Sequence, residues 1–367
     1  MKTAVHFGAG KIGRGFIAEL LHDSGYKIVF VDVVDALVDL VNKEHKYNLY
    51  LIDKDHEKKI IDNVEAFSSI KEPERVIEAI KEAEIITTSV MATNLDKIAP
   101  ILAKGLCERE DQAIVMACEN AIMGTNILRD ELLKTGIISE EKLVTVTNFA
   151  NTAVDRMVFD YKDGIEIGGD FELAIEDVLG TRPIVGAEYV DDIGKYLQRK
   201  IYMINCGHAL SAYFGFVAGY DILQDALRDP EIQSEVRAAV LESASALEQE
   251  YGFKHEDLVE YMEGMLIRRF TTPGVKDDIA RVAREPIRKI SPNDRIMGPA
   301  FMCEKYGLDN THLLKGVACA LKYKNDDDEQ AVELQNYIKD NGIEKAISHF
   351  TGIDANSDMF KKVLDYM

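Results

Sequence analysis

Three glycines near the start of the chain have the spacing of a loop that binds the phosphates of a dinucleotide. Gly8, Gly10 and Gly13 follow an apolar run at residues 3–7 and open a helical pattern over residues 11–22. In such a unit the first glycine allows a tight turn, the second lets the backbone approach a pyrophosphate, and the third packs the helix on the strand. The N–H groups of the first helical turn can then bind phosphate oxygens. The residues predicted here to bind the cofactor are Phe7, Gly8, Ala9, Gly10, Lys11, Ile12 and Gly13.

Asp32 ends the next predicted strand, 19 residues after Gly13. A carboxylate at this position can accept hydrogen bonds from both ribose hydroxyls of an adenosine, and it would repel a 2'-phosphate. Val33 and Val34 offer no cation that could bind such a phosphate instead. The sequence therefore predicts NAD as the cofactor, with Asp32 as one of its ligands.

A lysine, an asparagine and a histidine form a second group: Lys200, Asn205 and His208. On a helix, Asn205 lies roughly 140° and His208 roughly 80° around from Lys200, so the three share one broad face. The apolar residues between them would desolvate the lysine amine and favour its neutral, proton-accepting form. A lysine base and an asparagine amide meet the needs of alcohol oxidation without a metal, because they remove the hydroxyl proton and stabilise the developing oxyanion.

Asn120 follows a predicted late strand at residues 112–117. The carboxyl ends of parallel strands open onto the ligand crevice, so its amide is a candidate for the same oxyanion. An asparagine at this position could instead begin a helix.

A basic segment interrupts an acidic chain between residues 267 and 295. Arginine forks bind phosphate oxygens through two parallel hydrogen bonds, so the segment predicts a phosphorylated substrate. Pairing with nearby carboxylates on a solvated surface explains many of these charges equally well. The candidate phosphate ligands are Arg284, Arg288 and Lys289.

The elements that must position these residues change in character between residues 180 and 200. Before this point, strand-like runs at residues 3–7, 27–32, 85–90, 112–117 and 143–147 alternate with helical patterns, and residues 47–64 suggest an inserted hairpin. After it, helical spacing dominates at residues 231–251, 255–270, 277–284 and 328–341. We predict an α/β Rossmann-like doubly wound N-terminal domain (residues 1–195) and a mainly α-helical C-terminal domain (residues 196–367), with a ligand cleft between them.

Composition narrows the classes of partner. A net charge of −21 opposes binding to nucleic acid or to an acidic membrane. No apolar run reaches the roughly 20 residues that cross a bilayer, and no cleavable signal pattern precedes the first strand. The five scattered cysteines contain no CxxC pair, so they predict neither a structural zinc site nor disulfides. We expect a cytoplasmic protein that binds a small molecule, and its oligomeric state is not readable from the sequence.

The chain resembles the polyol-specific long-chain dehydrogenase family, whose signature is K-x4-N-x2-H. The likeness extends over essentially the full length. It includes residues 8–16, Cys118-Glu119-Asn120, the run NTAVDR at residues 151–156 and the run REPIRK at residues 284–289. Thr271-Thr272-Pro273 departs from the family, where an asparagine is expected before the proline, and this affects only local loop contacts.

The resemblance implies that Lys200 is the general base, that Asn205 and Asn120 form the oxyanion hole, and that His208 positions a substrate hydroxyl. It also implies interconversion of D-mannitol 1-phosphate and D-fructose 6-phosphate with NAD. Dehydrogenases of non-phosphorylated polyols share the signature and are the nearest alternative. A β-hydroxyacid or 6-phosphogluconate-type dehydrogenase would space the lysine and asparagine more tightly. A catalytically silent NAD-sensing module is a third alternative, and the intact Lys-Asn-Asn-His set argues against it.

Overall fold

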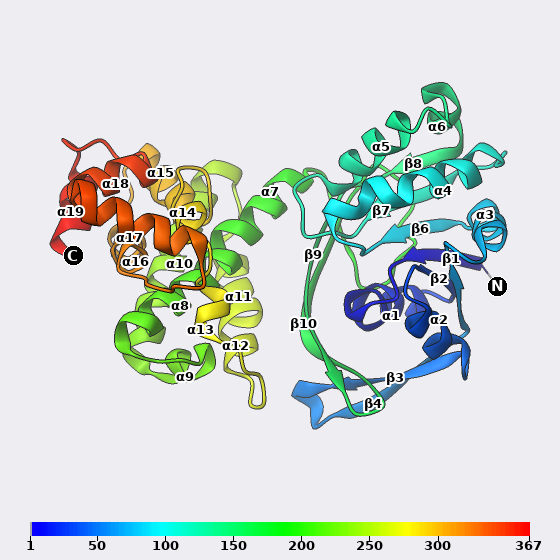
Figure 1. Cartoon of the computed structure of the whole chain (residues 1–367), viewed down its shortest axis with the longest axis horizontal. Helices are drawn as coiled ribbons and strands as arrows, with labels where there is room; N and C mark the ends of the chain where they lie inside the picture. Colours follow the sequence, from blue (N-terminus) through cyan, green and yellow to red (C-terminus); the bar gives the residue numbers. More distant parts are fainter. Residues whose placement is uncertain (1) are drawn as a thin grey trace. The chain divides into compact units, whose positions relative to one another are not determined.

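The computed structural model describes residues 2–367 and divides the chain into two compact units (Figure 1). The first ends at Leu197 and is drawn from blue to green, and the second runs from Gln198 to Met367 and is drawn from green to red. Each unit buries apolar clusters of its own. Each can therefore be described as a separate folded body.

A six-stranded, all-parallel sheet forms the centre of the first unit, in the order β5-β2-β1-β6-β7-β8. The strands are β1 (Lys2–Phe7), β2 (Tyr26–Asp32), β5 (Val64–Ser68), β6 (Ile85–Thr88), β7 (Ala113–Ala117) and β8 (Thr147–Phe149). The order reverses between β1 and β6, and ligands of doubly wound sheets bind outside the carboxyl ends of the strands at such a point. The predicted Rossmann-like architecture is confirmed.

Successive residues of the central strands point into different cores. Ile28 and Phe30 of β2 pack in one cluster, whereas Val29 and Val31 pack in another. This alternation explains why the strands are apolar throughout, since a parallel sheet is buried on both faces. The helices of the unit are α1 (Ala18–Asp23), α2 (Asp35–Asn42), α3 (Pro73–Glu82), α4 (Leu95–Cys107), α5 (Gly124–Lys134) and α6 (Glu140–Val146). The cluster that contains Ile28 includes α1 and α2, and the cluster that contains Val29 includes α3 to α6.

A second sheet, in the order β11-β10-β3-β4 with β9 paired to β10, contributes to the same core as α1. Its strands are β3 (Lys46–Leu51), β4 (Glu57–Asp62), β9 (Thr152–Tyr161), β10 (Gly164–Glu176) and β11 (Glu188–Val190). The antiparallel pairing of β3 with β4 confirms the predicted hairpin. The longer hairpin of β9 and β10 was not predicted.

One predicted strand, at residues 143–147, is wrong, because α6 (Glu140–Val146) occupies most of it. Ser139 caps this helix by accepting a hydrogen bond from Lys142 N, and Glu140 and Glu141 lie in its first turn. Carboxylates are favourable at a helix N-terminus, so the cap and the dipole outweigh the strand preference of the β-branched residues. The strand itself, β8, begins only at Thr147.

The second unit is helical, and its helices enclose one large apolar cluster. The helices from the end of the first unit onward are α7 (Ile193–Arg199), α8 (Cys206–Ala218), α9 (Leu223–Arg228), α10 (Pro230–Tyr251), α11 (His255–Met262), α12 (Arg269–Thr271), α13 (Ile279–Val282), α14 (Pro286–Lys289), α15 (Met297–Tyr306), α16 (Thr311–Leu321), α17 (Glu329–Asn341), α18 (Ile343–Thr351) and α19 (Asp358–Asp365). The mainly helical C-terminal half is confirmed. Within residues 2–367, no helix combines the length and apolarity needed to cross a membrane.

Candidate active site

The glycine turn lies between β1 and the helix that follows it. Gly8 has a φ of +105°, which favours glycine, and a Cβ there would lie 2.6 Å from Ser89 O. A Cβ on Gly13 would overlap Gly8 O and lie 2.8 Å from His6 Nε2, so this glycine packs the helix onto the strand. Apart from its neighbours along the chain, no atom of residues 2–367 lies within 4 Å of a Cβ placed on Gly10. The backbone at Gly10 is therefore open to a ligand.

Asp32, at the end of β2, orders this turn with its carboxylate. Its Oδ2 accepts a hydrogen bond from Ala9 N at 2.7 Å, and its Oδ1 accepts one from Val34 N at 2.9 Å. Each carboxylate oxygen has further acceptor capacity. The structure thus brings Asp32 beside the glycine turn, as the motif predicts.

The other predicted cofactor residues lie along the same loop. Phe7 ends β1, and its carbonyl accepts a hydrogen bond from Ser89 N at 2.8 Å. The helix begins at Lys11, continues through a π-helical turn, η1 (Gly13–Ile17), and leads into α1. Lys11 forms an exposed ion pair with Asp160 at 3.1 Å. Ile12, which follows it, is exposed.

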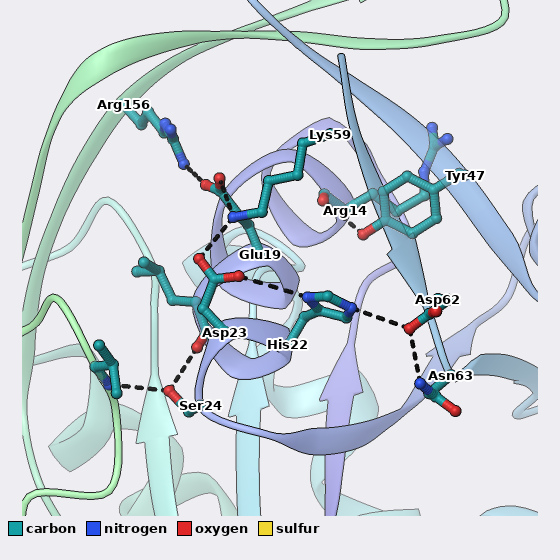
Figure 2. A network of polar contacts seen from close by, with 12 residues as sticks. Arg14, Glu19, His22, Asp23, Ser24, Tyr47, Lys59, Asp62, Asn63 and Arg156 are labelled. Atoms are coloured by element: carbon teal, nitrogen blue, oxygen red, sulfur yellow. Dashed lines mark hydrogen bonds and ion pairs between the residues drawn. The ribbon is translucent and has the colours of Figure 1, made fainter. Parts of the chain in front are cut away.

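The helix after the turn is anchored to the second sheet by a polar network (Figure 2). The buried carboxylate of Glu19 in α1 binds Arg156 of β9 and accepts a hydrogen bond from Lys59 of β4 at 2.9 Å. The Tyr47 hydroxyl of β3 donates to Arg14 O at 2.7 Å. These contacts connect Arg14, near the start of the helix, and Glu19, in α1, to the second sheet, and so hold the helix beside the glycine turn.

A buried histidine lies beneath the glycine turn, and sequence reasoning missed it. His6 Nδ1 lies 2.7 Å from Thr87 Oγ1, and His6 Nε2 lies 2.8 Å from Ser89 Oγ. Burial lowers the pKa of His6 to about 3, so the ring is neutral at ordinary pH. His6 thus connects β1 to the loop after β6, and a histidine within an apolar strand was the only sequence signal.

Glu119, next to the predicted Asn120, organises the same loop. Its buried carboxylate accepts hydrogen bonds from Thr88 Oγ1 at 2.6 Å and from the N–H groups of Val90 and Met91, both at 2.9 Å. Met91 has a φ of +73°, a strained conformation for a residue with a side chain. Asn120 itself is exposed, and α5 begins later, at Gly124 with Met123 as its N-cap. The alternative that Asn120 begins a helix is therefore wrong.

Lys200, Asn205 and His208 lie on one continuous helical segment of the second unit. Residues Lys200–Asn205 form a π-helical turn, η4, and α8 continues from Cys206. π-Helical hydrogen bonds join residues five apart. The turn therefore brings Lys200 and Asn205 closer to the same side of the helix than the ideal α-helix expected from the sequence would. Lys200 is only 7% exposed, and Asn205 is partly exposed.

His208 lies between an aromatic ring and a carboxylate of the second unit. Its ring stacks on Phe270, with 4.3 Å between the ring centroids, and its Nε2 lies 3.8 Å from Asp277 Oδ2. Burial lowers the pKa of His208, and the charge of Asp277 opposes this. Although burial disfavours the charged form of Asp277, His208 and Arg281 bring its pKa down to about 2. At neutral pH these shifts favour a neutral imidazole at His208 beside an ionised carboxylate at Asp277.

The three predicted phosphate ligands have different environments. Arg284 is exposed, whereas the exposed Arg288 pairs with Glu285 at 2.6 Å. Lys289 is buried, and its ammonium donates to the carbonyls of Val282 and Arg284. Burial, with the charges of Arg295 and Arg288, lowers the pKa of Lys289 to about 7. The side chain of Lys289 is thus already hydrogen-bonded to backbone carbonyls of its own segment.

The basic segment lies close to the helix that carries Asn205 and His208. Arg281 pairs with Asp277, the carboxylate beside His208. Burial raises the pKa of the Cys206 thiol, and the charge of Arg295 opposes that rise. Arginines of this segment therefore act electrostatically on Asp277, beside His208, and on Cys206, next to Asn205.

Comparison with known proteins covers both units. The family model of the mannitol dehydrogenase Rossmann domain matches residues 2–181, and that of the mannitol dehydrogenase C-terminal domain matches residues 192–366. The mannitol-1-phosphate 5-dehydrogenase of Oceanobacillus iheyensis is 39% identical over 100% of this chain and 98% of its own length. The Bacillus subtilis protein of the same name is 37% identical over 98% of each chain.

Solved structures share the fold. The substrate-free form of a D-sorbitol dehydrogenase superposes with a TM-score of 0.84 at 16% identity and covers 100% of this chain and 92% of its own. The ternary complex of Pseudomonas fluorescens mannitol 2-dehydrogenase with NAD and D-mannitol has a TM-score of 0.70 at 18% identity, with coverage of 100% and 90%. The family models and the full-length relatives establish that this chain belongs to the mannitol dehydrogenase family of oxidoreductases.

Proposed function

We propose that the chain interconverts D-mannitol 1-phosphate and D-fructose 6-phosphate with NAD as cofactor and Lys200 as general base. The observation that carries the proposal is the run of relatives named mannitol-1-phosphate 5-dehydrogenase, at 36% to 39% identity along nearly the whole chain. Residues 1–195 would bind the cofactor, and residues 196–367 would supply the substrate and catalytic residues.

The glycine turn fits a dinucleotide. Gly10 leaves room for a ligand against the backbone, and Asp32 places a carboxylate beside the turn. Asp32 and residues 7–13 would hold NAD, with the carboxylate directed to the ribose hydroxyls and opposed to a 2'-phosphate. The nicotinamide, when bound, supplies the group that accepts or returns the hydride.

Lys200 would transfer the proton, and the amides of Asn205 and Asn120 would stabilise the charge on the oxygen. In alcohol oxidation, the Lys200 amine takes the proton of the reacting hydroxyl while the carbon gives up its hydride. The amides of Asn205 and Asn120 would donate hydrogen bonds to the oxygen as negative charge develops on it. In carbonyl reduction, the Lys200 ammonium returns the proton to the same oxygen.

His208 would orient the substrate rather than transfer the reacting proton. A neutral imidazole both donates and accepts hydrogen bonds, and burial favours this form of His208. Its Nε2 is buried and makes no hydrogen bond with residues 2–367, so it can bind a substrate hydroxyl.

The phosphate would bind to Arg284 and Arg288, with Lys289 close behind them. Support comes from the exposure of both guanidiniums and from Lys289, whose side chain is hydrogen-bonded to Arg284 O. We expect Arg284→Ala to raise the KM for fructose 6-phosphate by about 10-fold, the size of one charge-assisted contact. Activity on unphosphorylated fructose serves as the internal control and should not change. Equal KM values for wild type and variant would remove Arg284 from the site.

The substrate assignment is tested by NADH oxidation with fructose 6-phosphate and fructose side by side. The proposal predicts a kcat/KM for fructose 6-phosphate that exceeds the value for fructose by orders of magnitude. Replacing NADH by NADPH should abolish most of the activity. A preference for fructose would assign the chain to the dehydrogenases of free polyols instead.

A further inference from the structure

The π-helical turn that carries Lys200 and Asn205 departs from α-helical hydrogen bonding at one identifiable place. In an α-helix the Cys206 N–H would donate to the carbonyl of Tyr202, four residues earlier. Here it donates to the carbonyls of Ile201 and Met203 instead. The Tyr202 carbonyl therefore does not accept the hydrogen bond from Cys206 N–H that a regular α-helix would give it.

A side chain from another helix binds that carbonyl. Ser243, on α10, donates its hydroxyl to Tyr202 O at 2.8 Å. Ser243 is completely buried, and α10 packs against η4. Other serines nearby bind within their own helices, since Ser245 donates to Leu241 O and Ser211 donates to Gly207 O. Of these three hydroxyls, only that of Ser243 bonds to a different helical segment, and it does so at the irregular turn.

We propose that Ser243 is a positioning residue that holds the turn Lys200–Asn205 in its π-helical form, and so sets the placement of Lys200 relative to Asn205. The inference rests on the proposed function only in calling these two residues catalytic. A buried carbonyl without a donor is costly, so loss of the hydroxyl favours return of the Cys206 N–H to Tyr202 O. That α-helical register would separate Lys200 and Asn205 to roughly 140° around the axis.

A close helix contact supports the same assignment. Gly207 lies between Asn205 and His208, and a Cβ on it would overlap Leu266 and lie 3.0 Å from Val240 of α10. The segment after the turn is therefore packed tightly against its neighbours. If the Cys206 N–H changes its hydrogen-bond partner, the packed segment at Gly207 cannot shift to accommodate the change. The residues before Cys206 must then move.

The test compares Ser243→Ala with Ser245→Ala on the same helix and with Ser211→Ala, a fully buried hydroxyl. We expect Ser243→Ala to lower kcat by about 10- to 100-fold, because a misplacement near 1 Å costs about this much. The Kd for NADH, which should bind the first unit, stays within about twofold of wild type. The melting temperature should fall no further than in Ser211→Ala. Ser243→Cys, which keeps a weak donor, should recover part of kcat.

Backbone hydrogen exchange of residues 200–206 in the unliganded protein provides a readout independent of catalysis. We expect faster exchange there in Ser243→Ala and not in the two controls. Unchanged kcat and exchange in Ser243→Ala, or equal losses in the controls, would overturn the proposal. If the wild type fails to oxidise NADH with fructose 6-phosphate, the proposed function fails, and the exchange experiment alone still decides the role of Ser243.

Discussion

Asp32 combines a structural and a proposed functional role in one side chain. Its two oxygens bind the N–H groups of Ala9 and Val34, and its charge lies beside the turn that is open at Gly10. The same carboxylate can therefore shape the loop and select the cofactor.

Asp32→Ala should weaken NADH binding by about 10- to 100-fold, the range for losing hydrogen bonds to a charged acceptor. The preference for NADH over NADPH should narrow, because the charge that repels a 2'-phosphate is gone. Asp35→Ala is the matched control, since Asp35 begins α2 nearby and pairs with the exposed Lys71. Titration of each reduced cofactor with protein, followed by nicotinamide fluorescence, measures these effects. Equal NADH affinity in Asp32→Ala and Asp35→Ala would contradict the assignment.

His6 predicts a pH dependence of stability. Its pKa is about 3 in the folded chain and roughly 6.5 when unfolded, so between these values only the unfolded chain binds the proton. The free energy of unfolding should therefore fall as pH decreases through this window, by up to about 1.4 kcal/mol per pH unit from this group. Urea unfolding of wild type and His6→Gln between pH 5 and pH 7 gives the contribution as a difference. Identical slopes in the two proteins would contradict it.

Single residues could be placed from the sequence where backbone geometry allows only one or two residue types. The spacing of Gly8, Gly13 and Asp32 predicted their places, because a positive φ, a close helix contact and a strand end require these residues. His6 and Glu119 were missed because their partners, the loop after β6 and its N–H groups, come together only in the folded sheet. Ser243 was missed for the same reason.

At the scale of elements, a buried ion pair connects the helix after the glycine turn to β9. Glu19 and Arg156 are both buried, and Arg156 also donates to Gly168 O at 2.8 Å. Removing one member of a buried pair leaves the other charge without compensation. The pair therefore holds the helix in place, and removing either charge should destabilise the fold strongly.

We expect Glu19→Gln to lower the free energy of unfolding by about 3–5 kcal/mol, as for other broken buried pairs. Glu140→Gln is the control, because Glu140 pairs with Arg129 at 2.7 Å on the surface, where such pairs contribute little. Urea unfolding at neutral pH compares the two variants. If Glu19→Gln is no less stable than Glu140→Gln, the network in Figure 2 does not stabilise the helix as described.

The elements also show where local patterns were insufficient. Apolar β-branched runs identified β1, β2, β6 and β7, and two alternating runs identified the hairpin of β3 and β4. The helix at Glu140–Val146 was misassigned because a β-branched run hid the Ser139 cap and the acidic first turn. The π-helical turn at Lys200–Asn205 depends on Ser243 and on close packing at Gly207, so no local rule could predict it.

At the scale of the whole molecule, each of the two units carries a different set of the proposed functional residues. The first carries the glycine turn, Asp32 and Asn120, and the second carries Lys200, Asn205, His208 and the basic segment. The chain is strongly acidic overall, with a net charge of −21, so the proposed anionic substrate would need local arginines to attract it. The order of parallel strands followed by helices was readable from the change in periodicity, whereas the second sheet was predicted only in part.

The most direct test measures NADH oxidation with fructose 6-phosphate by wild type, Lys200→Ala and Lys200→Arg. Arginine keeps the positive charge but does not release its proton at neutral pH, so it separates a base from a charged contact. The account predicts that both variants lose turnover by orders of magnitude while the Kd for NADH stays near the wild-type value. Turnover near that of the wild type in either variant would contradict the assignment of Lys200 as the general base.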